Sequence, residues 1–470
     1  MAKIAPAYDL ILKNGRVMTP GGLVETDVAV KDGRIADLGD FARAPAAEII
    51  DCKGLHLLPG VIDTQVHFRE PGLTHKEDLS TGTLSAIMGG VTTVFEMPNT
   101  DPLTVTAAAF HDKLHRAAEK AFCDYAFFIG GCAENAHLIG ELERLPGCCG
   151  TKIFMGSSTG ALLAAQDEVI LKILQHGSRR VALHAEDEER LKSRKHIAEK
   201  SHDVKDHPVW RDAECALLAV QRAVKLARQA GRKIHLLHVT SGDEMAWLKD
   251  HKDIATIETT PQHLTLSAPE CYERLGTRAQ MNPPIRDAKH TEALWKAVQN
   301  GTVDVLGSDH APHTLEEKAK EYPASPSGMT GVQTMLPVML NHVSKGRLSL
   351  ERVVDLLCHG PQRIYQIAGK GRIAAGYDAD FALVDLSRRE TITNRWIKSR
   401  CGWSPFDGMA VTGWVQGTIL RGRAVMWDNE LTEAAKTRLG RGQPARFADL
   451  LTPATIVADG DVITPKIECC

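Results

Sequence analysis

Histidine and glutamine side chains with the spacing of a strand face follow an early apolar run in this sequence. The stretch 63–72 reads Asp-Thr-Gln-Val-His-Phe-Arg-Glu-Pro-Gly and comes after apolar residues at 57, 58, 61 and 62. Residues two apart on a strand point to the same side, so Gln65 and His67 should face one site together. Imidazole nitrogens suit zinc and neighbouring divalent metals, whereas a glutamine amide is a poorer ligand. The stretch therefore predicts part of a metal site in which Gln65 is the weak position.

Four further apolar runs end in residues with the same kind of chemistry. They carry Lys152, His184, His238 and Asp309. A single histidine near a strand end is more often a satisfied polar residue than a ligand, but several such ends together favour a metal site. Asp309 could bind a metal through one oxygen and take a proton from bound water with the other. Metal binding lowers the pKa of water from about 15.7 to about 7, which supplies a nucleophile at neutral pH.

Lys152 is the unusual member of this set, because an ammonium group would be repelled by metal cations. A desolvated lysine has a lowered pKa, and its neutral amine can add carbon dioxide to form a carbamate. The carbamate is an anionic oxygen ligand able to bridge two metals. Alternatively, the stem of Lys152 packs in the protein while its head pairs with Asp309 or Glu186. Residue chemistry alone leaves both interpretations open.

These residues need a scaffold that gathers strand ends at one face. Between the strand-like runs lie amphipathic stretches with helical spacing, such as 212–229. Eight β/α repeats predict a TIM barrel, whose active site lies at the C-terminal ends of the strands. A doubly wound open sheet is the alternative, but no Gly-rich phosphate loop follows any run. The eight runs are 60–68, 91–98, 124–131, 150–156, 180–186, 233–240, 254–260 and 303–309.

Strand patterns with tight turns flank this centre on both sides. An Asn-Gly at 14–15 and an Asp-Gly at 32–33 lie between alternating apolar residues, which is a strong hairpin signal. Similar alternation returns at 379–385 and 415–425, and no pattern is clear beyond Asp428. Both chain ends should therefore join in one small domain beside the barrel. We expect a β-sandwich with an irregular C-terminal tail from 1–58 plus 372–470, and a barrel from 59–371.

The composition of the 470 residues is ordinary for a globular protein, with 43% apolar and 24% charged residues. A net charge of −3 gives no basic field, so we expect neither nucleic acid nor an anionic membrane as a partner. No apolar run reaches membrane-spanning length, and the N-terminus lacks the pattern of an export signal. Eleven cysteines form no CxxC pair, so we expect reduced thiols and a cytoplasmic location.

Five of these motifs resemble the amidohydrolase superfamily, in particular the dihydroorotases of the longer bacterial type. The resemblance covers about residues 8–428. The family fold, a TIM barrel beside a small β-sandwich from both termini, agrees with the expected domains. The most specific pieces are His67-Phe-Arg-Glu-Pro-Gly72, Glu96-Met-Pro-Asn-Thr100, Lys152-Ile-Phe-Met-Gly-Ser-Ser-Thr-Gly160, Asn282-Pro-Pro-Ile-Arg286 and Ser308-Asp-His-Ala-Pro-His313.

The resemblance implies one or two zinc ions and a role for each matching ligand. Lys152 would be carboxylated by carbon dioxide, and His184 and His238 would bind the second metal. Asp309 would be both a ligand and the proton shuttle. Because Gln65 replaces the first histidine of the family's usual pair, the first metal should bind weakly. We therefore expect a site that is mononuclear, or one in which the first metal is loosely held.

The resemblance also implies the substrate and the reaction. Arg69, Asn99 and His313 would hold a substrate carboxylate, and Asn282 would contact a dihydropyrimidine ring. A planar guanidinium suits this role because it binds a carboxylate through two parallel hydrogen bonds. The implied reaction is the reversible cyclisation of N-carbamoyl-L-aspartate to L-dihydroorotate in de novo pyrimidine biosynthesis. We expect a homo-oligomer acting on this small molecule.

Other functions stay open from the sequence. The chain could be a non-catalytic homologue that scaffolds aspartate transcarbamoylase, an allantoinase or hydantoinase, or a barrel that binds a small ligand without metal. Arg69 could instead pair with Glu70 or Asp78, and Asn99 could cap a turn between prolines. Four converging polar strand ends argue against a scaffold, and Arg69 argues against substrates without a carboxylate.

Three further features have structural interpretations. His310 could orient Asp309, and the loop 328–331 could be a lid or a plain connector. Gln262 should lie outside the ligand set. We expect the histidines in helical or loop stretches at the surface, namely His75, His111, His115, His196, His202 and His207.

Overall fold

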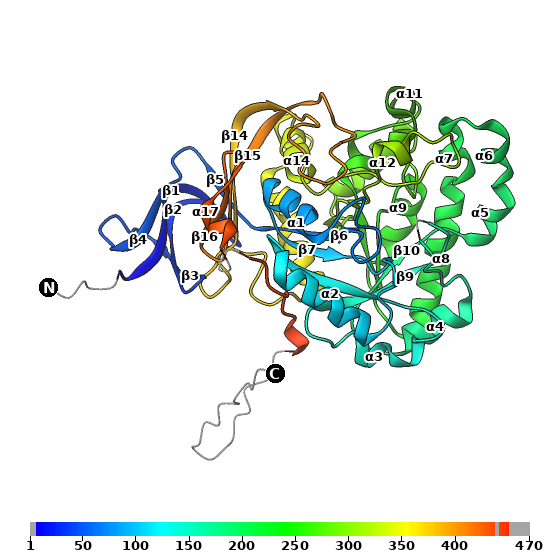
Figure 1. Ribbon diagram of the computed structural model, residues 1–470, viewed down its shortest axis with the longest axis horizontal. Coiled ribbons are helices and arrows are strands. Elements are labelled where there is room, and N and C mark those ends of the chain that lie inside the picture. Colours follow the sequence, from blue (N-terminus) through cyan, green and yellow to red (C-terminus); the bar gives the residue numbers. More distant parts are fainter. Residues whose placement is uncertain (1–5, 159, 438–440, 451–470) are drawn as a thin grey trace, which may run out of the picture.

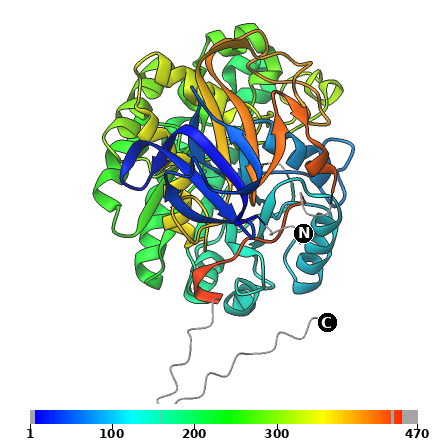
Figure 2. The ribbon, with the colours of Figure 1, turned by 90° about the vertical axis from the view of Figure 1, so that its left-hand side faces the viewer.

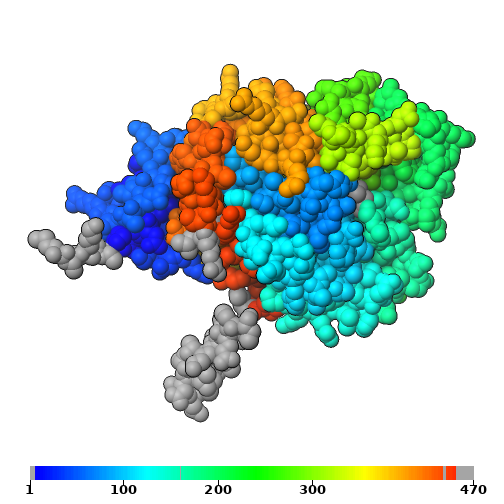
Figure 3. Space-filling view, viewed as in Figure 1, coloured from blue at the N-terminus to red at the C-terminus, as the bar shows by residue number. Residues whose placement is uncertain are grey.

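A computed structural model describes residues 6–158, 160–437 and 441–450 of the chain. Figure 1 shows a barrel of strands and helices beside a domain of β-strands. Figure 3 gives the same view with all atoms, in which the C-terminal strands lie between the N-terminal strands and the barrel. The last twenty residues, including Cys469 and Cys470, lie outside the described residues.

Eight parallel strands form the barrel, as the sequence predicted. They pair in chain order from β6 to β13. The ring closes where Val66 bridges to His310, and the backbone N–H of His67 donates to the carbonyl of His310 at 2.7 Å. The prediction of a TIM barrel is therefore confirmed, and the open-sheet alternative is wrong. The strands are β6 (Val61–Val66), β7 (Val91–Glu96), β8 (Asp124–Gly130), β9 (Cys148–Phe154), β10 (Val181–His184), β11 (Ile234–Leu236), β12 (Ala255–Thr259) and β13 (Val305–Leu306).

Helices between the strands cover the outside of the barrel. The predicted helix at 212–229 is α8, which the Asp212 side chain caps by accepting from the N–H of Cys215, and which ends at Gly231 in the left-handed conformation. Its buried face includes Ala216, Val220 and Val224. The main outer helices are α1 (Leu79–Met88), α2 (Ala107–Lys120), α3 (Ile139–Leu142), α4 (Asp167–Gln175), α8 (Ala213–Ala230), α9 (Gly242–Leu248), α12 (Ala288–Gln299) and α14 (Met335–Ser344). Three short helices, α5 (Glu188–Arg194), α6 (His196–Ser201) and α7 (His207–Trp210), precede α8.

Strands from both chain ends share one mixed sheet, so the expected two-ended β domain is confirmed. Its order is β17-β16-β15-β14-β5-β1-β2-β3, and β4 pairs with β1. Figure 2 views this sheet with the barrel behind it. The strands are β1 (Tyr8–Thr19), β2 (Gly22–Lys31), β3 (Arg34–Gly39), β4 (Ala46–Asp51), β5 (His56–Pro59), β14 (Phe381–Thr391), β15 (Ala410–Leu420), β16 (Arg423–Trp427) and β17 (Glu430–Leu431).

One of the two predicted hairpin turns is wrong. Asp32-Gly33 forms the turn between β2 and β3, with positive φ at both residues. Asn14 also has a positive φ, of 59°, but it lies inside β1, where the register with β2 shifts between Leu12 and Gly15. Asn-Gly therefore forms a bulge here, and a Cβ at Gly15 would collide with the Leu57 side chain.

The segment after Asp428 is more regular than the sequence indicated. It contains β17 and a short helix, α17 (Glu433–Lys436), and residues 441–450 return to the barrel. There the carbonyl of Tyr125 accepts from the N–H of Ala445 at 2.8 Å, and Phe447 is buried against Phe95. Because Tyr125 lies near the start of β8, this segment covers the N-terminal end of the barrel. No described helix is long and apolar enough to cross a membrane.

Candidate functional site

The barrel brings most of the predicted residues to one pocket at the C-terminal strand ends. Gln65 lies near the end of β6, His67 comes just after it, and Asp309 comes just after β13. Lys152 and His313 are buried beside the pocket but do not line it. The lining residues are Gln65, His67, Arg69, Asn99, Phe154, Ser158, His184, His238, Asn282, Asp309, Ala311, Ser327 and Gly328.

In one half of the site, Gln65 and His67 both contact the Asp309 carboxylate. It accepts a hydrogen bond from the amide nitrogen of Gln65 at 2.9 Å, and its Oδ1 lies 3.3 Å from Nε2 of His67. The other ring nitrogen of His67 is 2.8 Å from Oδ1 of Asn99. Burial raises the pKa of Asp309, but the hydrogen bond with His67 and the nearby imidazole of His238 hold it well below its ordinary value. Asp309 is therefore ionised, and Gln65 and His67 face the same site as predicted.

His184 and His238 form the other half. Nδ1 of His184 lies 3.0 Å from Nε2 of His238, and Nε2 of His184 lies 2.8 Å from Glu186. Arg211 holds Glu186 through both carboxylate oxygens. Since an ionised carboxylate only accepts, Nε2 of His184 carries the proton and its Nδ1 lone pair faces His238. Carboxylate-oriented imidazoles of this kind are typical metal ligands.

Lys152 is buried, with 1% of its surface exposed, and yet its amine has no hydrogen-bond partner among the described residues. Burial lowers the pKa of its amine to about 7. Its nitrogen lies 4.4 Å from the ring centre of Phe154. The alternative in which Lys152 pairs with Asp309 or Glu186 is therefore wrong, because both carboxylates are bound by other side chains. A buried amine with a lowered pKa and no partner fits the lysine that could react with carbon dioxide.

The donor atoms fit zinc as two separate pairs. Two atoms that bind one tetrahedral ion at about 2.0–2.1 Å lie roughly 3.3 Å apart, close to the 3.3 and 3.0 Å of the two pairs. Buried atoms without partners, Nδ1 of His238 and Oε1 of Gln65, also lie here. A carboxylated Lys152 would complete the set. Gln65 turns its N–H₂ group, not its oxygen, toward Asp309.

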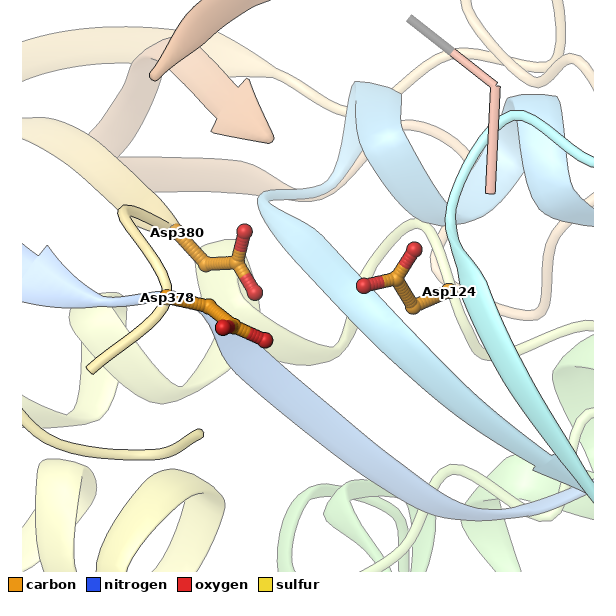
Figure 4. Close-up of side chains that lie close together, drawn as sticks. All are labelled: Asp124, Asp378 and Asp380. Carbon is orange, nitrogen blue, oxygen red and sulfur yellow. The ribbon is translucent and has the colours of Figure 1, made fainter. Parts of the chain in front are cut away.

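Asp124, Asp378 and Asp380 are the one group of described His, Cys, Asp or Glu residues whose ligand atoms all lie within 4.8 Å of one another. In Figure 4, Asp124 faces the other two across a gap. The ammonium of Lys370 lies 2.5 Å from Asp124, 2.6 Å from Asp380 and 3.2 Å from Asp378. Lys370 already supplies the cation, and these aspartates raise its pKa. The cluster therefore joins the two domains by ion pairs.

Arg69 is buried at the edge of the pocket without a carboxylate within 4 Å in the described part of the chain. Its Nε donates to the carbonyl of Pro312 at 3.3 Å. Glu70 instead binds Lys120, and Asp78 binds Arg400. The structural alternative for Arg69 is therefore wrong.

His313 lies next to the Arg69 guanidinium. Its Nδ1 lies 3.1 Å from the ammonium of Lys76, and its Nε2 lies 3.0 Å from the carbonyl of Ser327 and 3.3 Å from Nη2 of Arg69. Because an ammonium only donates, Nδ1 accepts and Nε2–H donates to Ser327. Burial lowers the pKa of His313 to about 3, so the ring is neutral. The Nη2 group of Arg69 faces a donor there, which leaves its own hydrogens for a ligand.

The structure corrects two other expectations and narrows a third. His207 is buried, not at the surface, and its ring contacts Asn282. His310 binds Glu77 at 3.2 Å rather than the Asp309 side chain. The loop 328–331 is buried, Gly328 packs against Ala311 and lines the pocket, and this packing favours the connector interpretation over the lid. The other five histidines expected at the surface are exposed. A four-residue helix such as α7 has too few turns to give a periodic signal, so sequence reasoning missed His207.

A larger cavity of about 550 Å³ adjoins the pocket. The two share Ser158, Asn282 and Ser327. Leu191 and Trp210 form part of its apolar wall. The cavity provides room for a ligand larger than the inner pocket holds.

Comparisons with known proteins agree with this arrangement. A family model described as "Amidohydrolase family" matches residues 56–425. The chain is 34% identical over 450 residues to a dihydroorotase of Methanosarcina mazei, covering 93% of this chain and 97% of the relative. It is 35% identical over 452 residues to an allantoinase of Deinococcus radiodurans, covering 93% and 99%. The solved L-hydantoinase (dihydropyrimidinase) from Arthrobacter aurescens superposes with a TM-score of 0.88 at 32% identity, covering 93% of this chain and 99% of that one.

Proposed function

The chain belongs to the amidohydrolase family and to its cyclic amide hydrolases, and from this premise we propose that it is a dihydroorotase. It interconverts N-carbamoyl-L-aspartate and L-dihydroorotate in pyrimidine synthesis. Dihydroorotase, allantoinase and hydantoinase relatives are about equally similar. Sequence identity therefore does not choose the substrate, and the choice rests on the chemistry of the pocket.

The buried guanidinium of Arg69 carries the proposal. A buried charge without a counter-ion is costly, and a ligand carboxylate would supply the missing partner. L-dihydroorotate bears a carboxylate on its ring, whereas allantoin and hydantoin do not. The carbonyl of Pro312 accepts from Nε of Arg69 and holds the guanidinium, while its other N–H groups are left for the ligand. Arg69 thus favours dihydroorotate.

The metal site would be built by His67, Asp309, His184, His238 and a carboxylated Lys152. A zinc ion bound there would lower the pKa of water and polarise the ring carbonyl. The chain's own residues do the rest. Asp309 is ionised, so it can accept a proton during hydrolysis and return it to the leaving ring nitrogen. Arg69 holds the carboxylate and thereby orients the ring over Asp309.

The half-site with Gln65 should hold metal less tightly. The amide of Gln65 occupies one lone pair of Asp309 as a donor and contributes no imidazole. His184 and His238 keep an undisturbed pair of facing ring nitrogens, and Glu186 orients the ring of His184. We therefore propose one firmly held zinc ion at His184 and His238, and one weakly held ion at the half-site that contains Gln65.

Hydantoin hydrolysis is the second candidate. The cavity of about 550 Å³ beside the pocket could receive a substituent on a hydantoin ring, and dihydroorotate has no group that needs this room. The two candidates differ in the contact that selects the substrate. Dihydroorotate would be selected by Arg69, and a substituted hydantoin by the adjoining cavity.

A side-by-side assay tests the proposal. Protein purified with zinc and bicarbonate is given L-dihydroorotate, allantoin, hydantoin and 5-substituted hydantoins. We expect kcat/KM for dihydroorotate to exceed the others by at least about 100-fold, since a site built around a buried polar group strongly rejects analogues lacking its partner. A preference for a hydantoin would favour the second candidate. Protein with no bound metal and no turnover would support a scaffold.

A further inference from the structure

His207 lies outside the strand ends yet reaches the pocket through Asn282. Its side chain is 1% exposed and sits at the start of α7, behind the pocket wall. Nε2 of its ring lies 3.0 Å from the backbone carbonyl of Met281 and 3.0 Å from Oδ1 of Asn282. Nδ1 lies 3.3 Å from the hydroxyl of Tyr322.

These contacts fix the proton on the His207 ring. The carbonyl of Met281 can only accept, so Nε2 must carry a hydrogen and donate to it. Burial and the nearby Arg211 lower the pKa of His207 to about 3, so the ring is neutral and Nδ1 is the acceptor. The Tyr322 hydroxyl then donates to Nδ1. All the hydrogen-bonding capacity of the ring is used by protein groups.

The same logic fixes the amide of Asn282. The two ends of an asparagine amide look alike, so its orientation must follow from its neighbours. The atom that faces Nε2–H of His207 has to be an acceptor, which is the amide oxygen. The N–H₂ group therefore points the other way, where it lies 3.4 Å from the hydroxyl of Ser158. Both Asn282 and Ser158 line the pocket.

We propose that His207 is a positioning residue that locks the amide of Asn282 so that only N–H donors face the pocket. The ligand group at this wall is then an acceptor, such as a ring carbonyl oxygen, and not a ring N–H. This inference rests on the proposed cyclic amide hydrolase function and deepens it. It assigns the orientation of the ring, because the carboxylate lies at Arg69 and a carbonyl lies at Asn282.

A double-mutant cycle tests the coupling. We expect H207F to raise KM about tenfold with little change in kcat, because a freely turning Asn282 amide loses roughly one hydrogen bond to the ligand. In an N282A background the same substitution should raise KM less than twofold. H207Q should restore most of the affinity, since its amide can donate in place of Nε2–H. Equal effects of H207F in both backgrounds would mean that His207 only fills space, and would overturn the proposal.

Two further measurements do not depend on H207F folding. N282D keeps an acceptor for His207 but offers no donor to the pocket, so KM should rise as much as in N282A. Wild-type affinity in N282D would overturn the proposal. Selective ¹⁵N-histidine NMR, assigned with H207Q, should show the Nε2–H tautomer whatever ring the protein hydrolyses. An Nδ1–H tautomer would refute the positioning role, whereas a preference for hydantoin in the side-by-side assay would refute only the dihydroorotase proposal.

Discussion

Replacing Lys152 by methionine should make the metal-free protein more stable while abolishing its metal site. Lys152 is buried and has no described partner, so folding must strip its amine of water and of a proton. Its pKa is 10.5 in the unfolded chain and about 7 in the folded one. At about pH 7.5 the difference corresponds to roughly 4 kcal/mol, at about 1.4 kcal/mol per pKa unit.

We therefore expect K152M to raise the free energy of unfolding by up to about 4 kcal/mol, measured by urea unfolding after dialysis against a chelator. The folded pKa lies below the unfolded one, so the unfolded chain binds more protons between pH 7 and 10.5. Wild-type stability should then rise with pH in this window, and the advantage of K152M should shrink. Protein grown with zinc should retain metal in the wild type and lose both metal and turnover in K152M.

Lys318 provides the matched control. It is buried to the same 1% exposure and burial likewise lowers its pKa to about 7, but its amine nitrogen donates to the carbonyls of Gln280 and Pro326 at 3.0 and 2.7 Å. K318M leaves both acceptors without a donor, so it should be at least about 2 kcal/mol less stable than K152M. The reasoning about Lys152 would be refuted if K152M were no more stable than K318M, or if it kept wild-type metal content.

Three other predictions concern the first metal, acid stability and the C-terminal segment. Q65H should tighten the weaker zinc ion by about tenfold or more in competition with a chelator, because imidazole is the better ligand; an unchanged affinity, or a changed substrate preference, would contradict this. His342 is buried, and its pKa is about 4 in the folded protein and 6.5 in the unfolded chain. The protein should therefore lose up to about 3 kcal/mol of stability as the pH falls from 6.5 to about 4. H342Q should remove that part of the slope in urea unfolding and the exposed control H111Q should not, whereas equal slopes would argue against a neutral buried His342. F447A should cost about 3–5 kcal/mol by leaving a cavity at the N-terminal barrel end while leaving KM unchanged; a loss under about 1 kcal/mol would mean that residues 441–450 contribute little.

The strand ends could be read from the sequence because their geometry is local. A two-residue period places Gln65 and His67 on one side, and the β/α alternation brings Asp309 to the same end of the barrel. The sequence could not decide between the two interpretations of Lys152, because its partners depend on which carboxylates other residues occupy. Arg211 takes Glu186, and that contact joins segments without any shared pattern.

Other predictions were wrong because the same local sequence pattern is compatible with more than one tertiary environment. Asn14 adopts the positive φ that a turn requires, but the chain continues as a strand and the residue becomes a bulge. His207 looked like a surface residue because a single turn of helix has no periodicity. Phe447 lies in a stretch without helical or strand periodicity, so its contact with Phe95 of the barrel could not be predicted from the sequence.

The selectivity for a substrate carboxylate tests the central claim most directly. Dihydrouracil has the ring of dihydroorotate without the carboxylate, so the ratio of kcat/KM for the two substrates isolates what Arg69 binds. In R69Q the value for dihydroorotate should fall by roughly 10² to 10⁴, since two charge-assisted hydrogen bonds of about 1.5–3 kcal/mol each are lost. The value for dihydrouracil should change little, so the ratio should collapse. An unchanged ratio in R69Q would contradict the assignment of Arg69 and with it the proposed substrate.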